Sequence, residues 1–196
     1  MSEYNTKNYN ETDLIKQAEK TAEETINILK NLSSDAAFLN TGKSPSIALA
    51  ESCTAGMVSS LLAGIPGASG FLWGSFVCYT KEAKISMLDL DKKDLETYSL
   101  VSRETAGVMA CAAMEKSGAC FSAAVTGLAG PEGDGSDVPV GTVWIATLMY
   151  NGKSRINKYH FKGSRNSIRI RAAITVLEEL IMAINEQLIY IKNTKK

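Results

Sequence analysis

A serine lies where an apolar, strand-like run gives way to a helical pattern. The run Ser46–Ala50 is uncharged, Ser52 follows it after one glutamate, and apolar residues recur at helical spacing over 54–64. At a helix start, unpartnered backbone N–H groups and the positive end of the helix dipole would stabilise an oxyanion. Ser52 is therefore our first candidate nucleophile. In the alternative interpretation, Ser52 or Thr54 only caps the helix, as serine and threonine do in many proteins.

A serine nucleophile needs a base, and the chain has one histidine. His160 lies in an alternating polar and apolar stretch typical of a surface strand, which argues against a serine–histidine triad. Lysine is the usual substitute when burial lowers its pKa. Lys81 and Lys84 both follow a predicted strand, and spacing does not choose between them; exposed helix positions are the alternative for both. Tyr79, at the end of that strand, could relay a proton or orient the lysine, or could simply pack at the surface.

Two arginines are candidates for binding an anionic group. Arg165 and Arg169 are four residues apart at a predicted helix start, so both would project from one face near free backbone N–H groups. Such an arrangement suits a phosphate. A solvated first turn with weak surface ion pairs is the alternative.

A glycine-rich loop is a further candidate for ligand binding. The uncharged strand 119–125 runs into this loop, which begins at Thr126 and Gly127. In α/β sheets, ligands collect at the strand ends, and both this loop and the Ser52 segment lie at such ends.

Hydrophobic periodicity predicts an α/β fold. Strands alternate with helices, and Asn151–Gly152 is a strong hairpin signal. We therefore expect a three-layer α/β/α sandwich with a mixed central sheet plus an N-terminal helical extension. Strands are expected at 46–51, 71–80, 119–125, 140–150 and 154–161, with helices at about 11–31, 54–64, 81–88, 105–117 and 168–191. Residues 33–45 are interpreted as a connection.

Composition argues against several classes of protein. Twenty-one basic and twenty-one acidic residues leave no net charge, so neither nucleic acid nor an anionic membrane is an expected partner. Only the basic cluster 162–171 favours nucleic acid. No apolar run approaches the roughly 20 residues of a membrane helix. The four cysteines have no C-x-x-C spacing and follow no secretory signal, so we expect reduced thiols, no metal site and a cytoplasmic protein.

Five blocks of the sequence together resemble the C-terminal domain family of competence-damage-inducible protein A (CinA), the nicotinamide mononucleotide deamidases. The blocks are Ala50-Glu51-Ser52-Cys53-Thr54-Ala55-Gly56, Phe76 to Lys84, Ala124 to Pro131, Pro139 to Val143, and Gly163-Ser164-Arg165 followed by Ile168-Arg169. Their order and spacing fit over about residues 44–185. The resemblance implies hydrolysis of the carboxamide of nicotinamide mononucleotide to nicotinate mononucleotide and ammonia, in pyridine nucleotide salvage, without a cofactor or metal.

The resemblance also implies roles for individual residues. It places the catalytic serine, tyrosine and lysine of the family at Ser52, Tyr79 and Lys84, rather than at Lys81. Ser52 would attack the amide carbon while neutral Lys84 accepts its proton and later passes that proton to ammonia. The expected substrate-binding residues are Thr54, Ala55 and Gly56 at the oxyanion, with Thr126, Gly127, Arg165 and Arg169 at the phosphate.

The chain departs from the family pattern at two positions. Ala55 stands where the family usually has glycine, and its methyl group could narrow backbone access or forbid a positive φ angle. Ser164 replaces the aspartate of a Gly-Asp-Arg block, with little effect expected because serine can also cap a helix. The larger N-terminal domain of two-domain members is not in this sequence. We therefore expect a stand-alone deamidase domain at 46–192 after an N-terminal helical extension at 1–45.

Two other functions remain open. The first is a catalytically silent member of the fold that binds a nucleotide or a partner protein, with Ala55 as its mark. The second is an amidase for another small carboxamide, because a serine and lysine pair does not name its substrate. We expect a homodimer or higher homo-oligomer, for which the N-terminal helix and the long C-terminal helix are candidate interfaces.

Overall fold

The computed structural model describes residues 10–194. The chain runs through α1 (Glu11–Ser33), α2 (Ala36–Leu39), β1 (Ile47–Glu51), α3 (Met57–Ala63), the 3₁₀ turn η2 (Ala68–Gly70), β2 (Leu72–Val77), α4 (Lys81–Leu88), α5 (Lys92–Tyr98), α6 (Arg103–Ser117), β3 (Phe121–Gly127), β4 (Thr142–Met149), β5 (Ser154–His160) and α7 (Arg165–Thr194). Residues 1–9 of the predicted extension lie outside the described residues.

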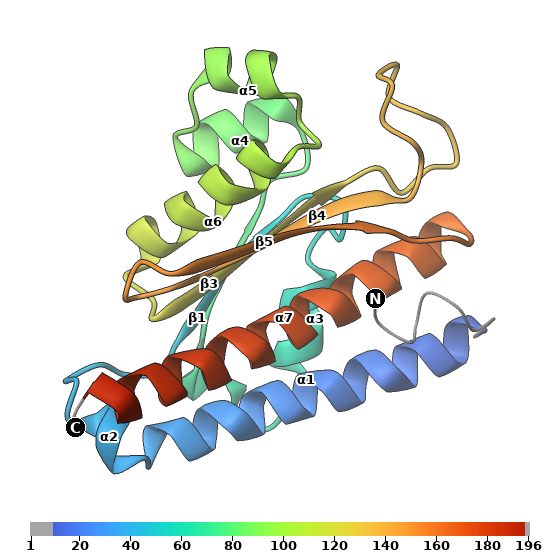
Figure 1. The fold of residues 1–196 in the computed structure, drawn as a ribbon. Coiled ribbons are helices and arrows are strands. Elements are labelled where there is room, and N and C mark those ends of the chain that lie inside the picture. Colours follow the sequence, from blue (N-terminus) through green and yellow to red (C-terminus); the bar gives the residue numbers. More distant parts are fainter. Residues whose placement is uncertain (1–9, 195–196) are drawn as a thin grey trace.

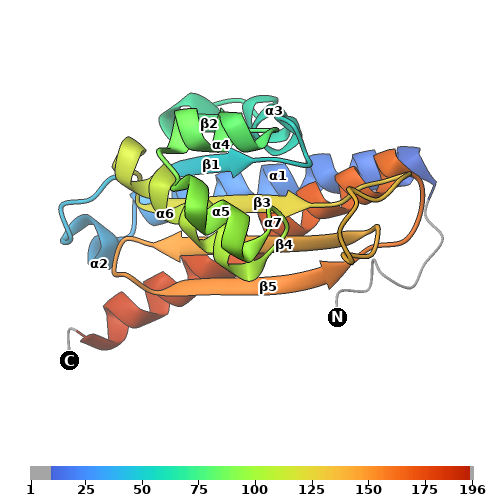
Figure 2. The ribbon, with the colours of Figure 1, turned by 90° about the horizontal axis from the view of Figure 1, so that it is seen from above.

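The five strands form one mixed sheet in the order β2-β1-β3-β4-β5. Strand β1 pairs in parallel with β2 and β3, whereas β4 is antiparallel to both β3 and β5 (Figure 2). Because β1, β2 and β3 run in the same direction, their carboxyl ends meet at one edge of the sheet. The segments that follow these three strands are therefore neighbours in space.

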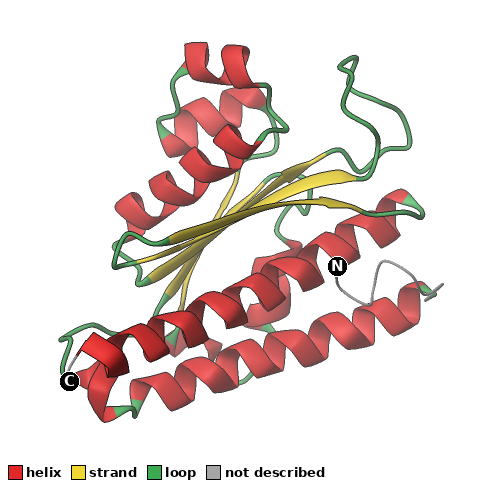
Figure 3. Cartoon of the chain, in the orientation of Figure 1, coloured by secondary structure: helices red, strands yellow, loops and turns green. Residues whose placement is uncertain are grey.

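Helices cover both faces of the sheet. Helices α4, α5 and α6 lie above it in Figure 1, and α1, α3 and α7 lie below it. Figure 3 shows the same three layers by secondary structure. The long helices α1 and α7 run side by side in both views. The expected α/β/α sandwich with a mixed sheet and an N-terminal helix is confirmed.

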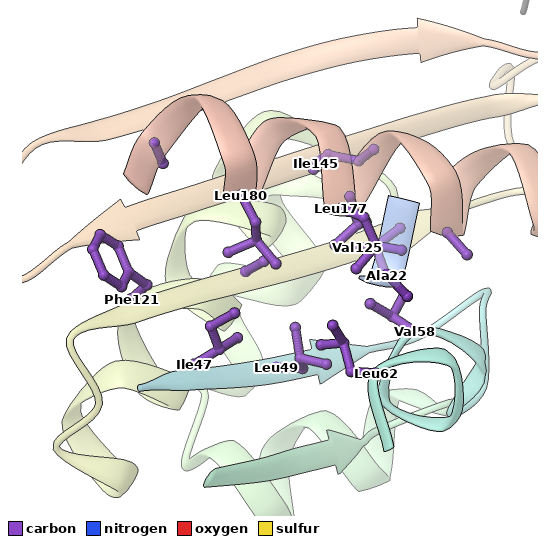
Figure 4. Packing of buried hydrophobic residues seen from close by; sticks show 14 of the residues in the cluster. Ala22, Ile47, Leu49, Val58, Leu62, Phe121, Val125, Ile145, Leu177 and Leu180 are labelled. Atoms are coloured by element: carbon purple, nitrogen blue, oxygen red, sulfur yellow. The ribbon is translucent and has the colours of Figure 1, made fainter. Parts of the chain in front are cut away.

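The lower layer is held by a large apolar cluster. Four buried residues of α1 recur at helical spacing and share this cluster with α3, α7 and the sheet: Ala22, Ile26, Leu29 and Leu32. Residues of the cluster labelled in Figure 4 are Ala22, Ile47, Leu49, Val58, Leu62, Phe121, Val125, Ile145, Leu177 and Leu180. Helix α1 thus packs into the same core as the sheet.

The upper layer is built from small side chains. Alanines of α6 meet alanines of three strands in a second cluster, which contains Ala48, Ala50, Ala106, Ala110, Ala113, Ala124 and Ala146. Small residues let helix and sheet approach closely, and the Ser122 hydroxyl donates to the carbonyl oxygen of Ala110 at 2.7 Å. This packing fixes the upper layer against β1 and β3.

Two short helices were not predicted. Helix α5 buries only Leu95, and α2 buries only Phe38, so neither has an apolar stripe. Both begin with an aspartate cap, Asp91 and Asp35, whose carboxylates accept from backbone N–H groups. Across residues 10–194, no helix has the combination of length and apolar character needed to cross a bilayer.

Candidate active site

The candidate site lies where β1, β2 and β3 end. Ser52 directly follows β1, and its N–H donates to the carbonyl oxygen of Val125 on β3 at 3.0 Å. On the other side, the N–H of Cys78 donates to the carbonyl oxygen of Glu51 at 2.9 Å. Parallel pairing thus continues one residue beyond β1, which fixes the backbone of Ser52 between its two neighbours.

Lys84 reaches Ser52 from α4. The hydroxyl of Thr80 caps this helix by accepting from the N–H of Ala83 at 3.1 Å, which sets the direction of the first turn. The ammonium nitrogen of Lys84 then lies 2.8 Å from Ser52 Oγ and donates to the carbonyl oxygen of Cys78 at 3.0 Å. Lys84 is 1% exposed and Ser52 is 7% exposed. A buried amine and a hydroxyl are therefore in direct contact.

Burial lowers the pKa of Lys84 below the usual range of a lysine. Among residues 10–194, no carboxylate forms an ion pair with Lys84 that would oppose this shift. A neutral amine in this place can donate one proton to the Cys78 carbonyl oxygen while its lone pair accepts the Ser52 proton. The geometry places a hydroxyl beside a candidate base.

The other candidate lysine points elsewhere. Lys81 pairs with Glu96 of α5 at 2.7 Å, and its side chain is 27% exposed. This is a surface ion pair of the kind that contributes little to stability. Spacing did not distinguish the two lysines, but only Lys84 contacts Ser52.

A buried carboxylate organises the loop after Ser52. Glu51 is 1% exposed, and each of its oxygens accepts two hydrogen bonds. Its partners are the hydroxyls of Thr54 and Ser75 and the N–H groups of Val58 and Ser59, at 2.8 to 3.0 Å. Two N–H groups at the start of α3 are therefore occupied, which differs from the free helix start expected beside Ser52.

The sequence interpretation assigned no role to Glu51. The available signal was one carboxylate at the end of an otherwise apolar strand, directly before the candidate nucleophile. A buried carboxylate needs several donors, so this position was the signal from which a local hydrogen-bond network could have been predicted.

Neither Ser52 nor Thr54 caps α3. The N-cap is Gly56, which makes no side-chain capping bond and has a φ of 90°. Ala55 also takes a positive φ, 52°, so its methyl group has not prevented the left-handed conformation. Within residues 10–194, the N–H groups of Thr54 and Gly56 have no acceptor, which leaves them as candidate oxyanion donors.

Cys53 does not compete with Ser52 as a nucleophile. It is 6% exposed, and burial raises the pKa of its thiol to about 12. The thiolate form is therefore scarce near neutral pH.

Arg165 joins two of the predicted segments at the protein surface. Its guanidinium donates to the hydroxyl of Tyr79 at 2.6 Å and to the carbonyl oxygen of Gly130. Tyr79 is 50% exposed and comes from the loop between β2 and α4. The structure thus brings Arg165 to Tyr79, at the surface rather than in the buried Ser52–Lys84 pair.

Arg169 lies one turn further along α7 and reaches the Ser52 loop. Its Nε donates to the carbonyl oxygen of Cys53 at 3.1 Å and its Nη2 to that of Thr54 at 2.9 Å. The predicted phosphate-binding role of this residue stays a prediction.

The β3 residues have structural partners. The hydroxyl of Thr126 donates to the carbonyl oxygen of Leu100 at 2.7 Å, and the residue is 1% exposed. A Cβ at Gly127 would lie 2.7 Å from the carbonyl oxygen of Thr142 on β4, so close strand packing explains this glycine. Their roles in substrate binding also stay predictions. No group of three potential metal ligands lies together among residues 10–194.

The fold is that of an α/β protein with a mixed five-stranded sheet, and a serine–lysine pair lies at its strand ends. The sequence profile of the CinA C-terminal domain matches residues 29–184, and the chain belongs to this family. A CinA-like protein from Syntrophomonas wolfei is 42% identical over 145 residues, which are 74% of this chain and 34% of that protein. A CinA-like protein from Geobacter metallireducens is 41% identical over 143 residues, with coverage of 73% and 34%. The chain thus spans about a third of the length of the curated relatives it matches.

Solved structures show the same fold. The competence/damage inducible protein CihA from Agrobacterium tumefaciens superposes with a TM-score of 0.75 at 36% identity, covering 86% of this chain and 96% of that one. A competence or damage-inducible protein from Enterobacter asburiae gives a TM-score of 0.76 at 26% identity, with coverage of 85% and 98%.

Proposed function

We propose that this protein hydrolyses the carboxamide of nicotinamide mononucleotide, giving nicotinate mononucleotide and ammonia, with Ser52 as nucleophile and Lys84 as base. The observation that carries the proposal is the 2.8 Å contact between the buried Lys84 amine and the Ser52 hydroxyl. Membership in the CinA C-terminal domain family supports the choice of substrate.

The reaction proceeds in two halves. Ser52 Oγ forms a bond to the amide carbon as its proton moves to Lys84 Nζ, and the resulting oxyanion is held by N–H groups of the loop that follows Ser52. The carbon–nitrogen bond then breaks as Lys84 returns the proton to the leaving ammonia. Water attacks the ester in the second half, with Lys84 again taking and returning a proton, and the carboxylate leaves.

The nucleotide end of the substrate is assigned to the surface near Tyr79. Arg165 lies there at the start of α7, and its guanidinium donates to the Tyr79 hydroxyl. We assign the phosphate to this side of the site. Tyr79 would lie between the phosphate, bound near Arg165, and the Ser52–Lys84 pair.

The silent-member alternative rests on Ala55. Since Ala55 adopts a φ of 52°, the loop keeps the left-handed conformation that the family glycine would allow. This observation favours the enzyme. An amidase for another small carboxamide would use the same Ser52–Lys84 pair, so substrate comparison is needed to separate the two.

The test measures ammonia release from nicotinamide mononucleotide, its dephosphorylated nucleoside and free nicotinamide. We expect turnover of the nucleotide by the wild type, loss of at least about 10³-fold in Ser52→Ala, and full activity in Ser60→Ala, an exposed serine of α3. Binding of the nucleotide without ammonia release would support the silent member. Faster release from another carboxamide would support the broader amidase.

A further inference from the structure

The Arg169 side chain contacts the backbone of the loop that follows Ser52. Its Nε and Nη2 donate to two successive carbonyl oxygens, those of Cys53 and Thr54, at 3.1 and 2.9 Å. Its third nitrogen, Nη1, donates to the side-chain oxygen of Asn166 at 3.4 Å. All three guanidinium nitrogens are thus engaged within the protein, and two of them hold the peptide groups that follow Ser52.

The positive charge of Arg169 is stabilised by backbone carbonyl oxygens. Within residues 10–194, no carboxylate pairs with it, in contrast to Arg155, which pairs with Glu179 at 3.0 Å. The Arg169 charge also acts on the neighbouring Cys53 thiol, where it favours the thiolate against the larger effect of burial. A cation on a carbonyl oxygen polarises the whole peptide group, which makes the N–H on its far side a stronger donor.

Peptide geometry sets the direction of these N–H groups. In a trans peptide the C=O and N–H point in opposite directions, so holding the Cys53 carbonyl turns the N–H of Thr54 away from Arg169. The Thr54 side chain is also held, because its hydroxyl donates to the Glu51 carboxylate at 2.8 Å. The N–H of Ala55 closes the turn by donating to the carbonyl oxygen of Ser52 at 3.1 Å.

We infer that Arg169 is a positioning residue, which fixes the loop after Ser52 and polarises the peptide whose N–H, that of Thr54, would stabilise the oxyanion, rather than a ligand of the substrate phosphate. The inference rests on the proposed function for its reaction. It leaves Arg165, at the surface beside Tyr79, as the arginine available for the phosphate.

The two roles predict different kinetics. A phosphate ligand acts only on the nucleotide, whereas a positioning residue acts on any carboxamide that reaches Ser52. We expect Arg169→Gln to lower kcat about 100-fold for both nicotinamide mononucleotide and its dephosphorylated nucleoside, with little change in KM or in the ratio of the two kcat/KM values. Arg169→Lys, which keeps the charge, should recover part of the loss.

The controls separate positioning from misfolding. Arg165→Gln should lower the preference for the phosphorylated substrate about tenfold or more. Arg103→Gln, on α6 and outside the site, should match the wild type. The inference is overturned if Arg169→Gln raises KM for the nucleotide alone, or if the kcat loss in Arg169→Gln and Arg169→Lys simply follows the fraction of unfolded protein.

A second measurement tests the inference even if the protein does not hydrolyse nicotinamide mononucleotide. A small sulfonyl fluoride reacts with an activated serine without any nucleotide, and intact-mass measurement gives the rate of Ser52 labelling. If the wild type releases no ammonia, slower labelling by about tenfold or more in Arg169→Gln but not in Arg103→Gln still supports the inference. Equal labelling rates, or no labelling of Ser52 in the wild type, would overturn it.

Discussion

The amine of Lys84 lies 2.8 Å from the hydroxyl of Ser52, although the two residues are 32 positions apart in the chain. The contact follows from topology: β1 and β2 are parallel neighbours, so the turn after β1 meets the helix after β2. Both side chains are buried there. Burying the Lys84 amine lowers the stability of the folded protein, and this effect can be measured by unfolding.

Lys84→Met should change the pH dependence of stability. Burial lowers the pKa of Lys84 in the folded protein, so between that pKa and the pKa of unfolded lysine the unfolded chain binds more protons, and wild-type stability rises with pH. The variant lacks this titration. We expect the free energy of unfolding of the wild type to rise relative to Lys84→Met between pH 7 and pH 10, by about 1.4 kcal/mol for each unit of pKa depression. Parallel pH curves in urea unfolding would contradict a buried, depressed Lys84.

Glu51→Gln should destabilise the protein. Both carboxylate oxygens accept two hydrogen bonds, so an amide NH₂ in either orientation faces two donors. Loss of these bonds costs about 2–3 kcal/mol. Urea unfolding measures the loss, with Glu23→Gln on the exposed side of α1 as the matched control. A Glu51→Gln variant as stable as the control would show that the network contributes nothing.

Ala55→Gly should stabilise the protein slightly. A residue with a Cβ costs about 1 kcal/mol in the left-handed region, and Ala55 has a φ of 52°. The greater freedom of glycine in the unfolded chain offsets part of the gain, so we expect about 0.5 kcal/mol. Ala63→Gly, at the end of α3, should instead lose about 0.5–1 kcal/mol. Equal destabilisation by both changes would argue against strain at Ala55.

Glu178→Gln should stabilise the protein at pH 8 but not at pH 4.5. Burial, followed by the charges of Glu179 and Glu24, raises the pKa of Glu178 to about 7. Between the unfolded pKa and pH 7 the folded protein binds more protons, so wild-type stability falls as pH rises through this range. The variant avoids that loss, and we expect a gain of about 1–3 kcal/mol at pH 8 in thermal or urea unfolding. The same difference at both pH values would rule out titration of Glu178 as its cause.

Much of the fold was predictable because its signals are local. The hairpin at Asn151–Gly152 joins β4 and β5 as expected, and α6 ends at Ser117 with Gly118 in the left-handed conformation. Helix α5 was missed because its stability depends on an aspartate cap and one buried leucine, Leu95, rather than on an apolar repeat. Such short helices depend on tertiary packing.

The site was predictable in its segments but not in its contacts. The strand end at Ser52 follows from the apolar run before it. The choice between Lys81 and Lys84 depends on the rotation of α4, which spacing alone does not give, and only the resemblance to the family favoured Lys84. The inward direction of Arg169 depends on how α7 crosses the Ser52 loop, a relationship between residues 115 and 116 positions apart.

The most direct test of the account is to trap the intermediate on Ser52. Wild type mixed with nicotinamide mononucleotide is quenched in acid at short times, and the peptide that contains Ser52 is examined by mass spectrometry. The account predicts an added acyl group on Ser52 that appears together with the first ammonia released, and it predicts no adduct and no release in Ser52→Ala and Lys84→Met. Steady hydrolysis by Ser52→Ala at the wild-type rate would contradict it.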